Sequence, residues 1–405
     1  MDTLQTLVAL IGYLIVGRLI IRRLSGGVRE FSFAVLNLAA VFFFLFYGSH
    51  EHFVMRFALY LGIIVALYVT VVLFAERRGG WPWLAFFFPI VILIVIRYIP
   101  GEAYVALGRL FGKSWRGAPT MVGISYLAFR CSRLVLEIRN GLVKRPNFPE
   151  YANFAFFLPT MPVGPINTYA NFRRGFSEKF DVPVGRALLR ILVGAVKYQF
   201  LGNLCNQLTY SGLLLDDHPH HWMDLPVAML FYYLYLYLNF SGFCDMAIGA
   251  AAIIGIPVPE NFDHPFAARN VKDFWNRWHI TLSTWMREVV FSPLSKFLVG
   301  KFGLPLADHA IALTIFIVFL LVGIWHGAGW NFAAYGAVHA LGVVANHYYT
   351  IFLKKKLGRE KFKAYNENRW IHAAAVGLTF CYCGASLIFF ANSFAQIKDI
   401  FATLR

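Results

Sequence analysis

Long apolar runs separated by short polar segments dominate the chain. A membrane-spanning helix needs about 20 consecutive, mostly apolar residues. The runs that qualify, with their flanks, are 4–21, 31–47, 57–74, 84–96, 188–204, 225–238, 240–256, 310–325, 333–344 and 373–390. A further run, 122–136, is mixed with Arg130, Ser132 and Arg133. The pattern therefore predicts an all-α integral membrane protein with ten or eleven spans.

Composition supports this interpretation and excludes the soluble classes. Hydrophobic residues make up 59% of the 405 residues, and charged residues only 14%. Lys+Arg 37 and Asp+Glu 21 are far fewer charges than the roughly 100 that a soluble chain of this length carries. So few charges cannot cover a globule, and most of the surface must therefore face lipid.

The positive charge follows the pattern of membrane topology. The net charge is +16, and the basic loops 22–30 and 76–80 lie two spans apart, which places both in the cytoplasm. Run 4–21 precedes its basic residues. We therefore predict a retained first helix, and no cleaved signal, with the N-terminus outside the cytoplasm. No basic stripe falls on one soluble element, which disfavours nucleic acid as a partner.

Two segments interrupt the simple spans. The first, FAFFLPTMPVGPIN at 154–167, is apolar but carries Pro159, Pro162, Gly164 and Pro165. Prolines so close together end a helix, and non-helical backbone at membrane depth must be covered by protein or line a cavity. We predict a re-entrant or interfacial turn, with a plain interhelical loop as the alternative.

The second segment is VKDFWNRWHITLSTWMREVV at 271–290, which has helical periodicity on two faces. One face is apolar and consists of Phe274, Trp278, Leu282, Trp285 and Val289. The other is polar and consists of Lys272, Asn276, His279, Ser283 and Arg287. A helix this polar does not span freely, so we predict that it lies at an interface or lines an internal cavity.

Two histidines are the main candidates for chemistry. His326 follows Trp325 at the end of an apolar run. An ionisable side chain there is a functional-site candidate, and imidazole exchanges protons near physiological pH. The alternative is an interfacial histidine bonded to a backbone carbonyl. His279 would orient or polarise a substrate in the same cavity, and its alternative is a residue at the headgroup level.

Other ionisable residues give weaker signals. Asp245 lies between apolar runs, so its carboxylate must pair or face a cavity, with Arg277 or Arg287 as conceivable partners. No metal site is predicted. The string His50-Glu51-His52 lacks ligand spacing, and a solvated loop is favoured over a metal site for the group His218, His220, His221, Asp216 and Asp217. There is also no nucleotide-binding loop, which disfavours a nucleotide-driven transporter.

Several strings, in order along the chain, resemble the bacterial branch of the membrane-bound O-acyltransferase family. They are VGISYLAFR at 122–130, FLPTMPVGPI at 157–166, FSGFCDMAIG at 240–249, PENF at 259–262, FWNRWHITLSTWMRE at 274–288 and GIWHG at 323–327. That branch includes the proteins of teichoic-acid D-alanylation, alginate O-acetylation and peptidoglycan O-acetylation. The resemblance extends from about residue 120 to the C-terminus.

The resemblance implies about eleven membrane helices, with re-entrant and interfacial helices, in a ring around a central tunnel. It implies one membrane domain over 1–405, with N-terminal spans in 1–120 and a motif-bearing core in 121–405. His326 matches the family's catalytic histidine, and His279 matches the histidine of its RWH motif. The residues expected to bind or support substrate are Asn276, Arg277, Trp278, Ser283, Arg287, Trp325, Asp245, Gly164 and Pro165.

The implied reaction carries a D-alanyl or acetyl group from a cytoplasmic thioester across the membrane to a hydroxyl of an envelope glycopolymer, or to an acyl-relay partner. The donor would be a phosphopantetheine carrier protein or acetyl-CoA, with no permanently bound cofactor. Membrane lipid and an extracytoplasmic acyltransferase are further expected partners, and the bacterial inner membrane is the expected location. A transporter or flippase of an envelope precursor, and a non-catalytic scaffold, remain as alternatives.

Overall fold

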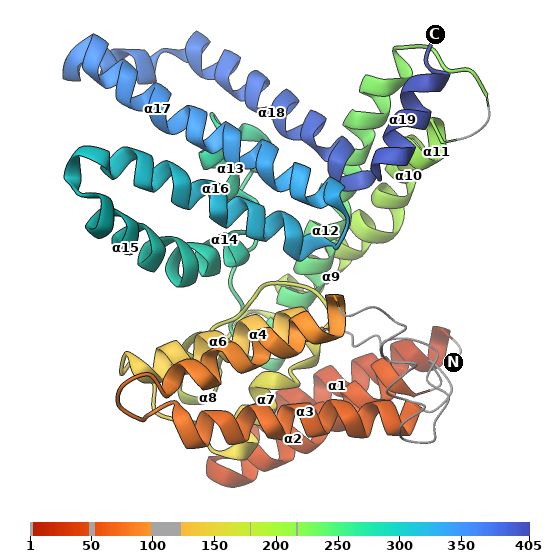
Figure 1. Cartoon of the computed structure of the whole chain (residues 1–405). Helices are drawn as coiled ribbons and strands as arrows, with labels where there is room; N and C mark the ends of the chain where they lie inside the picture. Colours follow the sequence, from red (N-terminus) through yellow and green to blue (C-terminus); the bar gives the residue numbers. More distant parts are fainter. Residues whose placement is uncertain (1–2, 48–52, 99–122, 179, 216–217) are drawn as a thin grey trace, which may run out of the picture. The chain divides into compact units, whose positions relative to one another are not determined.

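The computed structural model describes residues 3–47, 53–98, 123–178, 180–215 and 218–405 (Figure 1). Every regular element in these ranges is helical, and the only β pairings in them are two isolated bridges. The predicted all-α membrane fold is confirmed. Six of the described helices are long and apolar enough to span a bilayer, and α4 (Pro82–Tyr98) is a shorter apolar helix. The predicted count of about eleven spans is not confirmed.

The six helices with spanning character match predicted runs. They are α1 (Thr3–Arg23), α2 (Gly26–Val41) with the π turn η1 (Phe42–Phe46), α3 (Phe53–Phe74), α12 (Asp224–Ile254), α16 (Ala307–His326) and α18 (Arg369–Ala391). Local chemistry sets several helix starts. The side chain of Asn368, for example, accepts hydrogen bonds from the backbone N–H groups of Trp370 and Ile371 in the first turn of α18, which would otherwise lack partners.

The other elements are shorter, more polar or interrupted. The helices are α6 (Ile124–Arg139), α7 (Phe148–Ala155), α8 (Tyr169–Ser177), α9 (Val184–Ala195), α10 (Gly202–Asn206), α11 (Tyr210–Leu213), α13 (Val271–Arg277), α14 (Ile280–Met286), α15 (Ser292–Phe302), α17 (Trp330–Glu367) and α19 (Phe394–Thr403). The π turns η3 (Val196–Leu201) and η5 (Arg287–Phe291) and the 3-10 turns η2 (Leu158–Thr160), η4 (Pro265–Ala267) and η6 (Leu304–Leu306) connect them.

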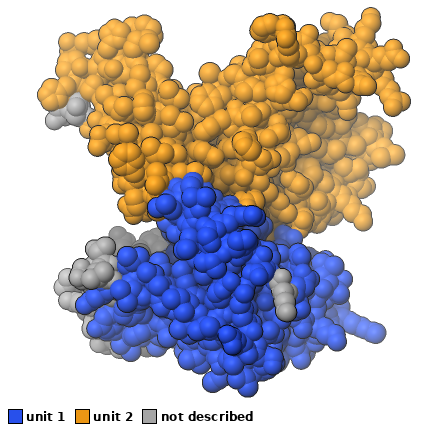
Figure 2. Space-filling view, turned by 180° about the vertical axis from the view of Figure 1, so that it is seen from behind, with its two compact units in different colours: residues 1–193, 243–259 blue, residues 194–242, 260–405 orange. Residues whose placement is uncertain are grey.

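The chain forms two compact units, which Figure 2 distinguishes by colour. Unit 1 contains residues 1–193 and 243–259, and unit 2 contains residues 194–242 and 260–405. The chain passes between the units inside α9, inside α12 and between Pro259 and Glu260.

Helix α12 corrects one prediction, because the runs 225–238 and 240–256 form a single helix of 31 residues. No residue between the two runs breaks a helix, and the glycines within α12 allow close packing instead. In unit 2, a Cβ on Gly242 would lie 2.7 Å from the carbonyl oxygen of Gly194. In unit 1, a Cβ on Gly249 would lie 2.8 Å from the carbonyl oxygen of Ala187. Such contacts between small residues and backbone are typical of membrane helix packing.

The proline-rich segment 154–167 is buried in unit 1. Helix α7 ends at Ala155, the single turn η2 follows, and the chain then runs without regular structure to the start of α8. Phe154, Phe156 and Phe157 are each 0% exposed. A plain interhelical loop would be solvated, so the burial favours the predicted turn covered by protein.

Arg130 supplies partners for this broken backbone. The guanidinium donates hydrogen bonds to the carbonyl oxygens of Phe154 at 3.1 Å and Ala155 at 3.2 Å, and the side chain is only 1% exposed. It also lies over the Phe154 ring, 5.5 Å from its centroid. Buried carbonyls at a helix end need donors, and Arg130 provides them without water.

We expect Arg130→Met to lower the stability of the folded protein strongly. The variant keeps the volume of the side chain but leaves two buried carbonyls without donors, a cost on the order of 3 kcal/mol. Thermal unfolding of the purified protein in detergent measures the effect. Arg174→Met is the control, because the exposed Arg174–Glu178 pair should contribute only about 0.5 kcal/mol. Equal melting temperatures for the two variants would contradict this role.

Candidate active site

His326 is the last residue of α16, at a point where α16 and α17 approach closely in unit 2 (Figure 1). Two glycines make this approach possible. A Cβ on Gly336 would lie 2.5 Å from the carbonyl oxygen of Phe319 and 3.1 Å from the Cα of Gly323. The close crossing fixes the backbone that carries the histidine.

Aromatic rings from three helices surround the half-buried His326. The ring centroid of His326 lies 4.6 Å from that of Trp325, 4.9 Å from that of Phe390 and 6.1 Å from that of Tyr335. These contacts hold the imidazole in an apolar setting while the residue stays partly exposed. A proton acceptor in such a setting has little competition from water.

His279 shows that the continuous helix predicted over 271–290 is wrong. Helix α13 ends at Arg277, His279 has φ 45° and ψ 52° in the left-handed region, and α14 begins at Ile280. The break comes from a distant residue. The backbone carbonyl of Asn261 accepts from the Ile280 N–H at 3.0 Å, which pulls the chain out of the helix at His279.

The same asparagine fixes the proton position on His279. The Oδ1 atom of Asn261 accepts from the Thr281 N–H at 3.1 Å and the Thr281 hydroxyl at 2.9 Å, so this atom is the amide oxygen. It lies 3.2 Å from Nδ1 of His279, which must therefore be the protonated nitrogen. The Nε2 atom is then the basic position of the neutral ring.

Burial keeps His279 neutral. The side chain is 4% exposed, and burial lowers the pKa of His279 to about 3, with the nearby His326 as the second cause. The His279 ring centroid lies 6.4 Å from that of Trp325, which in turn contacts His326. The rings of both histidines predicted from sequence therefore lie near the ring of Trp325.

A third histidine, His339 on α17, was missed by the sequence analysis. Its Nδ1 lies 3.2 Å from Nε1 of Trp275, which can only donate, so Nδ1 accepts. Nε2 of a neutral ring therefore carries the proton and donates to the Ser386 hydroxyl at 2.9 Å. Ser386 donates onward to the carbonyl oxygen of Cys383 at 2.7 Å.

These bonds connect α13, α17 and α18 and use both nitrogens of His339. The His339 ring also lies 4.6 Å from Tyr335, which faces His326. His339 therefore has a positioning role. It lies inside the predicted span 333–344, so the rule that selected His326, an ionisable residue in an apolar run, would also have found it.

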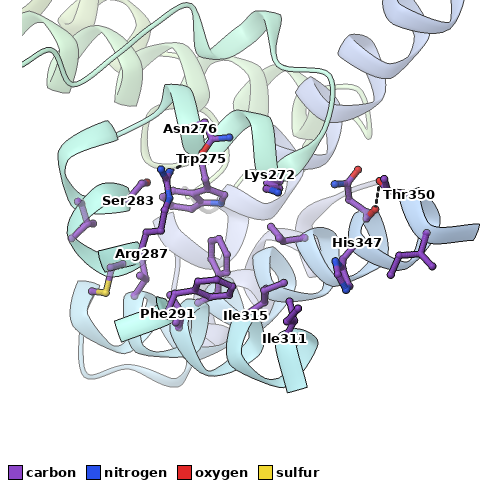
Figure 3. Close-up of a pocket in the computed structure, with 18 of the residues that line it drawn as sticks. Lys272, Trp275, Asn276, Ser283, Arg287, Phe291, Ile311, Ile315, His347 and Thr350 are labelled. Atoms are coloured by element: carbon purple, nitrogen blue, oxygen red, sulfur yellow. Dashed lines mark hydrogen bonds between the residues drawn. The ribbon is translucent and has the colours of Figure 1, made fainter. Parts of the chain in front are cut away.

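A cavity of about 670 Å³ lies between α13–η5 and the α16–α17 pair (Figure 3). Its walls are mostly aliphatic and aromatic. The polar side chains that line it are Lys272, Asn276, Ser283, Arg287, Asn346, His347, Thr350 and Lys354. None of the described lining residues is a carboxylate. The cavity therefore suits a molecule that is apolar along its length and carries negative charge.

The cavity extends along α16 toward His326. Lining residues on this helix run from Ile311 to Val322, a distance of about 16 Å at 1.5 Å per residue. Val322 lies one helical turn before His326. Of the predicted substrate-binding residues, Asn276, Ser283 and Arg287 line the cavity, and Arg287 donates to the Asn276 amide oxygen at 2.9 Å.

The other predicted site residues lie elsewhere. Arg277 pairs with Asp273 at 3.0 Å, and Trp278 packs in an aromatic cluster with Phe262 and Phe274. Asp245, Gly164 and Pro165 belong to unit 1. The ion-pair partner that the structure gives Asp245 is Arg190, at 3.0 Å, rather than the suggested Arg277 or Arg287. Asp245 therefore forms an ion pair that links α12 to α9.

No group of three metal-ligating side chains occurs within the described ranges. The strings that were weighed as metal sites fall partly outside these ranges, because residues 50–52, 216 and 217 are not described. His218, His220 and His221 are described, and the backbone of His220 pairs with the C-terminal Leu404 region.

Comparison with known families decides the class of protein. The sequence profile of the MBOAT, membrane-bound O-acyltransferase family, matches residues 50–365. The chain belongs to this family. It is a multi-pass membrane O-acyltransferase, and this activity replaces the transporter and scaffold alternatives. The match includes both His279 and His326.

Individual relatives of this acyltransferase act on cell-envelope polymers. It is 32% identical over 286 residues to a teichoic acid D-alanyltransferase of Streptococcus thermophilus, covering 67% of this chain and 68% of the relative. It is 30% identical over 282 residues to the teichoic acid D-alanyltransferase of Bacillus subtilis, covering 68% and 70%. It is also 30% identical over 215 residues to a peptidoglycan O-acetyltransferase of Helicobacter pylori, covering 52% and 39%.

We expect His339→Leu to destabilise the acyltransferase by about 1–3 kcal/mol, because the buried Trp275 N–H loses its acceptor. His339→Asn places an amide oxygen near the position of Nδ1 and should recover part of that loss. Thermal unfolding in detergent compares the two, with the half-buried His372→Leu as the control on α18. If the His339 and His372 variants have the same melting temperature, the hydrogen bonds of His339 to Trp275 and Ser386 do not hold α13, α17 and α18 together.

Proposed function

We propose that this acyltransferase moves a D-alanyl or acetyl group from a thioester donor to a hydroxyl of a cell-envelope glycopolymer, or to an acyl-relay partner. The observation that carries the proposal is the arrangement of His279 and His326 around Trp325, one helical turn from a carboxylate-free cavity. The names of the relatives support an envelope polymer as acceptor and both acyl groups.

His326 is the proposed general base. A base works best when its pKa lies near the working pH, and the pKa of His279 is lowered to about 3 by burial. His279 therefore remains neutral and accepts a hydrogen bond through Nε2, which orients the acceptor hydroxyl or the His326 ring. Its Nδ1–H is already directed to Asn261, so it does not donate to an oxyanion.

The cavity is the proposed site of the donor. Coenzyme A and the phosphopantetheine arm of a carrier protein both join a phosphate to a thioester through a flexible arm. Lys272, Arg287 and Lys354, which line the cavity, would bind the phosphate, because cationic side chains form charge-assisted hydrogen bonds with phosphate oxygens. The thioester would then lie toward Val322 and His326. The donor is not bound permanently.

The proposed step is balanced without a metal or a redox partner. The acceptor oxygen attacks the thioester carbonyl carbon while its proton passes to Nε2 or Nδ1 of His326. The C–S bond then breaks, and the leaving thiolate takes the proton from His326. A C–O ester and a free thiol result. The low water content of an apolar site limits hydrolysis of the thioester.

The wider setting is proposed from the same family. The chain would act as one membrane domain over 1–405 in the bacterial inner membrane, with its N-terminus outside the cytoplasm and residues 121–405 carrying the site. A cytoplasmic carrier protein or acetyl-CoA would deliver the acyl group, and an extracytoplasmic acyltransferase would receive it where a relay operates. The basic loops 22–30 and 76–80 support this orientation.

We expect His326→Ala to slow acyl transfer by about 10²–10⁴-fold, the range for loss of a general base, and so to lower the ester content of the envelope. His279→Asn is the better second variant, because asparagine tolerates the left-handed backbone and its amide still donates to Asn261. It removes only the basic nitrogen. Mass spectrometry of the acid released from cell envelopes, at matched expression, identifies acetate or D-alanine.

His372→Ala controls for the loss of a histidine from unit 2 and should leave the ester content unchanged. Wild-type ester levels in both His326→Ala and His279→Asn cells would sink the histidine mechanism. Equal loss in the His372 variant would show that the effect comes from folding.

We expect Lys354→Met to raise the KM for the thioester donor about fivefold with little change in kcat, because a phosphate contact contributes about 1 kcal/mol at a partly exposed site. The neighbouring Lys355 is exposed and does not line the cavity, so Lys355→Met is a matched control. Initial rates with a short acyl-thioester donor at varied concentration give both constants. Identical KM values for the two variants would place the donor phosphate elsewhere.

A further inference from the structure

A second cavity, of about 560 Å³, lies in unit 1 and takes no part in the proposed reaction. The end of α1, the start of α2, the end of α8 and the residue after α12 form it. Its charged lining consists of Arg22, Arg23, Arg29, Glu178 and Asp181. Some of these charges are already satisfied within the protein.

Both carboxylates are engaged by arginines. Asp181 accepts a hydrogen bond from Arg22 and lies 3.8 Å from Arg18. Glu178 pairs with Arg174 at 3.0 Å. Each carboxylate is thus neutralised by at least one guanidinium, and neither offers a partner to the remaining cations of the cavity.

Arg23 and Arg29 are the remaining cations. Neither forms an ion pair with any residue that the structure describes. Arg29 lies over the ring of Phe176, with its guanidinium carbon 5.3 Å from the centroid. Its Nε atom is buried and has no hydrogen-bond partner among the described residues. A buried donor without a partner is costly, and a bound anion would satisfy it.

The position of the cavity indicates where that anion comes from. The apolar run of α1 ends at Arg23, and α2, also long and apolar enough to span, begins at Gly26. The turn between two spans lies at the membrane surface, at the level of the lipid headgroups. Basic pockets at this level are suited to anionic headgroups, and arginine binds phosphate oxygens in a bidentate manner.

We propose that this cavity binds the phosphate of an anionic phospholipid headgroup through Arg23 and Arg29. The phosphate oxygens accept from the two guanidinium groups, including the buried Nε of Arg29. The lipid glycerol lies against the apolar part of the wall, near Phe176. Bound lipid then joins α1, α2 and α8 at the membrane surface. The site does not depend on the histidines or on the acyl donor.

The experiment compares the purified full-length protein in nanodiscs of phosphatidylcholine with and without phosphatidylglycerol. Native mass spectrometry counts retained phosphatidylglycerol molecules, and a fluorescent phosphatidylglycerol analogue gives the affinity by energy transfer. Each arginine near a charged membrane surface contributes about 1 kcal/mol, which is about fivefold in affinity. We expect Arg23→Gln/Arg29→Gln to bind about 25-fold more weakly, and the binding to weaken as salt rises.

Controls separate charge from folding. Arg78→Gln removes an exposed arginine from another loop and should leave the affinity unchanged. Arg29→Lys keeps the charge and should retain most of the binding. The single variant Arg23→Gln provides a measurement if the Arg29 variants fail to fold, because Arg23 is exposed.

The outcomes decide between sources of phosphate. Loss of one retained phosphatidylglycerol in the double variant, with no effect of Arg78→Gln, supports the headgroup site. Equal binding in wild type and double variant overturns it. Displacement of the lipid analogue by millimolar inorganic phosphate, with no retained lipid in the mass spectra, also overturns the lipid assignment and identifies a site for soluble phosphate.

Discussion

A polar group buried in this chain is costly unless it finds a partner inside the protein, because the surrounding helices are apolar and exclude water. That constraint shapes both units. In unit 1, the broken backbone after α7 exists because Arg130 donates to two carbonyl oxygens. In unit 2, the break between α13 and α14 exists because Asn261 accepts from the backbone of the residues that follow it. Each irregular segment is therefore stabilised by hydrogen bonds from one buried polar residue, Arg130 in unit 1 and Asn261 in unit 2.

The same constraint assigns different roles to chemically identical side chains. His339 has both nitrogens occupied, by Trp275 and Ser386, and so has no nitrogen left for a substrate. His279 has one nitrogen occupied by Asn261, and its other nitrogen is basic but strongly desolvated. His326 lies half-buried among aromatic rings beside them. Pairing thus gives His339 a structural role and leaves one nitrogen of His279 for a ligand, which fits the proposal that His326 is the base.

The spanning helices can be predicted from the sequence, because each needs a local run of about 20 residues that tolerate lipid. The sequence also predicts the non-helical segment 154–167, where prolines act locally. Prediction from sequence fails where a contact from a distant residue determines the local backbone. Periodicity over 271–290 indicates one helix, and only the contact from Asn261 breaks it. The runs 225–238 and 240–256 form one helix because no residue between them breaks it, and the close packing of its glycines is a tertiary contact that no single-segment pattern contains. His279 and His326 could be selected from sequence, but their shared neighbour Trp325 and the positioning by His339 are tertiary facts.

The excess of positive charge, +16, can now be divided by what each group contacts. Arg130 is structural, since backbone carbonyls occupy it. Arg190 neutralises Asp245 within the membrane helices. Lys272, Arg287 and Lys354 face a cavity without a carboxylate, whereas Arg23 and Arg29 face another where the carboxylates are already paired. A topology signal requires only that a cation lie on the correct side of the membrane. It does not explain why these cations line cavities in which no carboxylate is left to pair with them, whereas the proposed anionic ligands would.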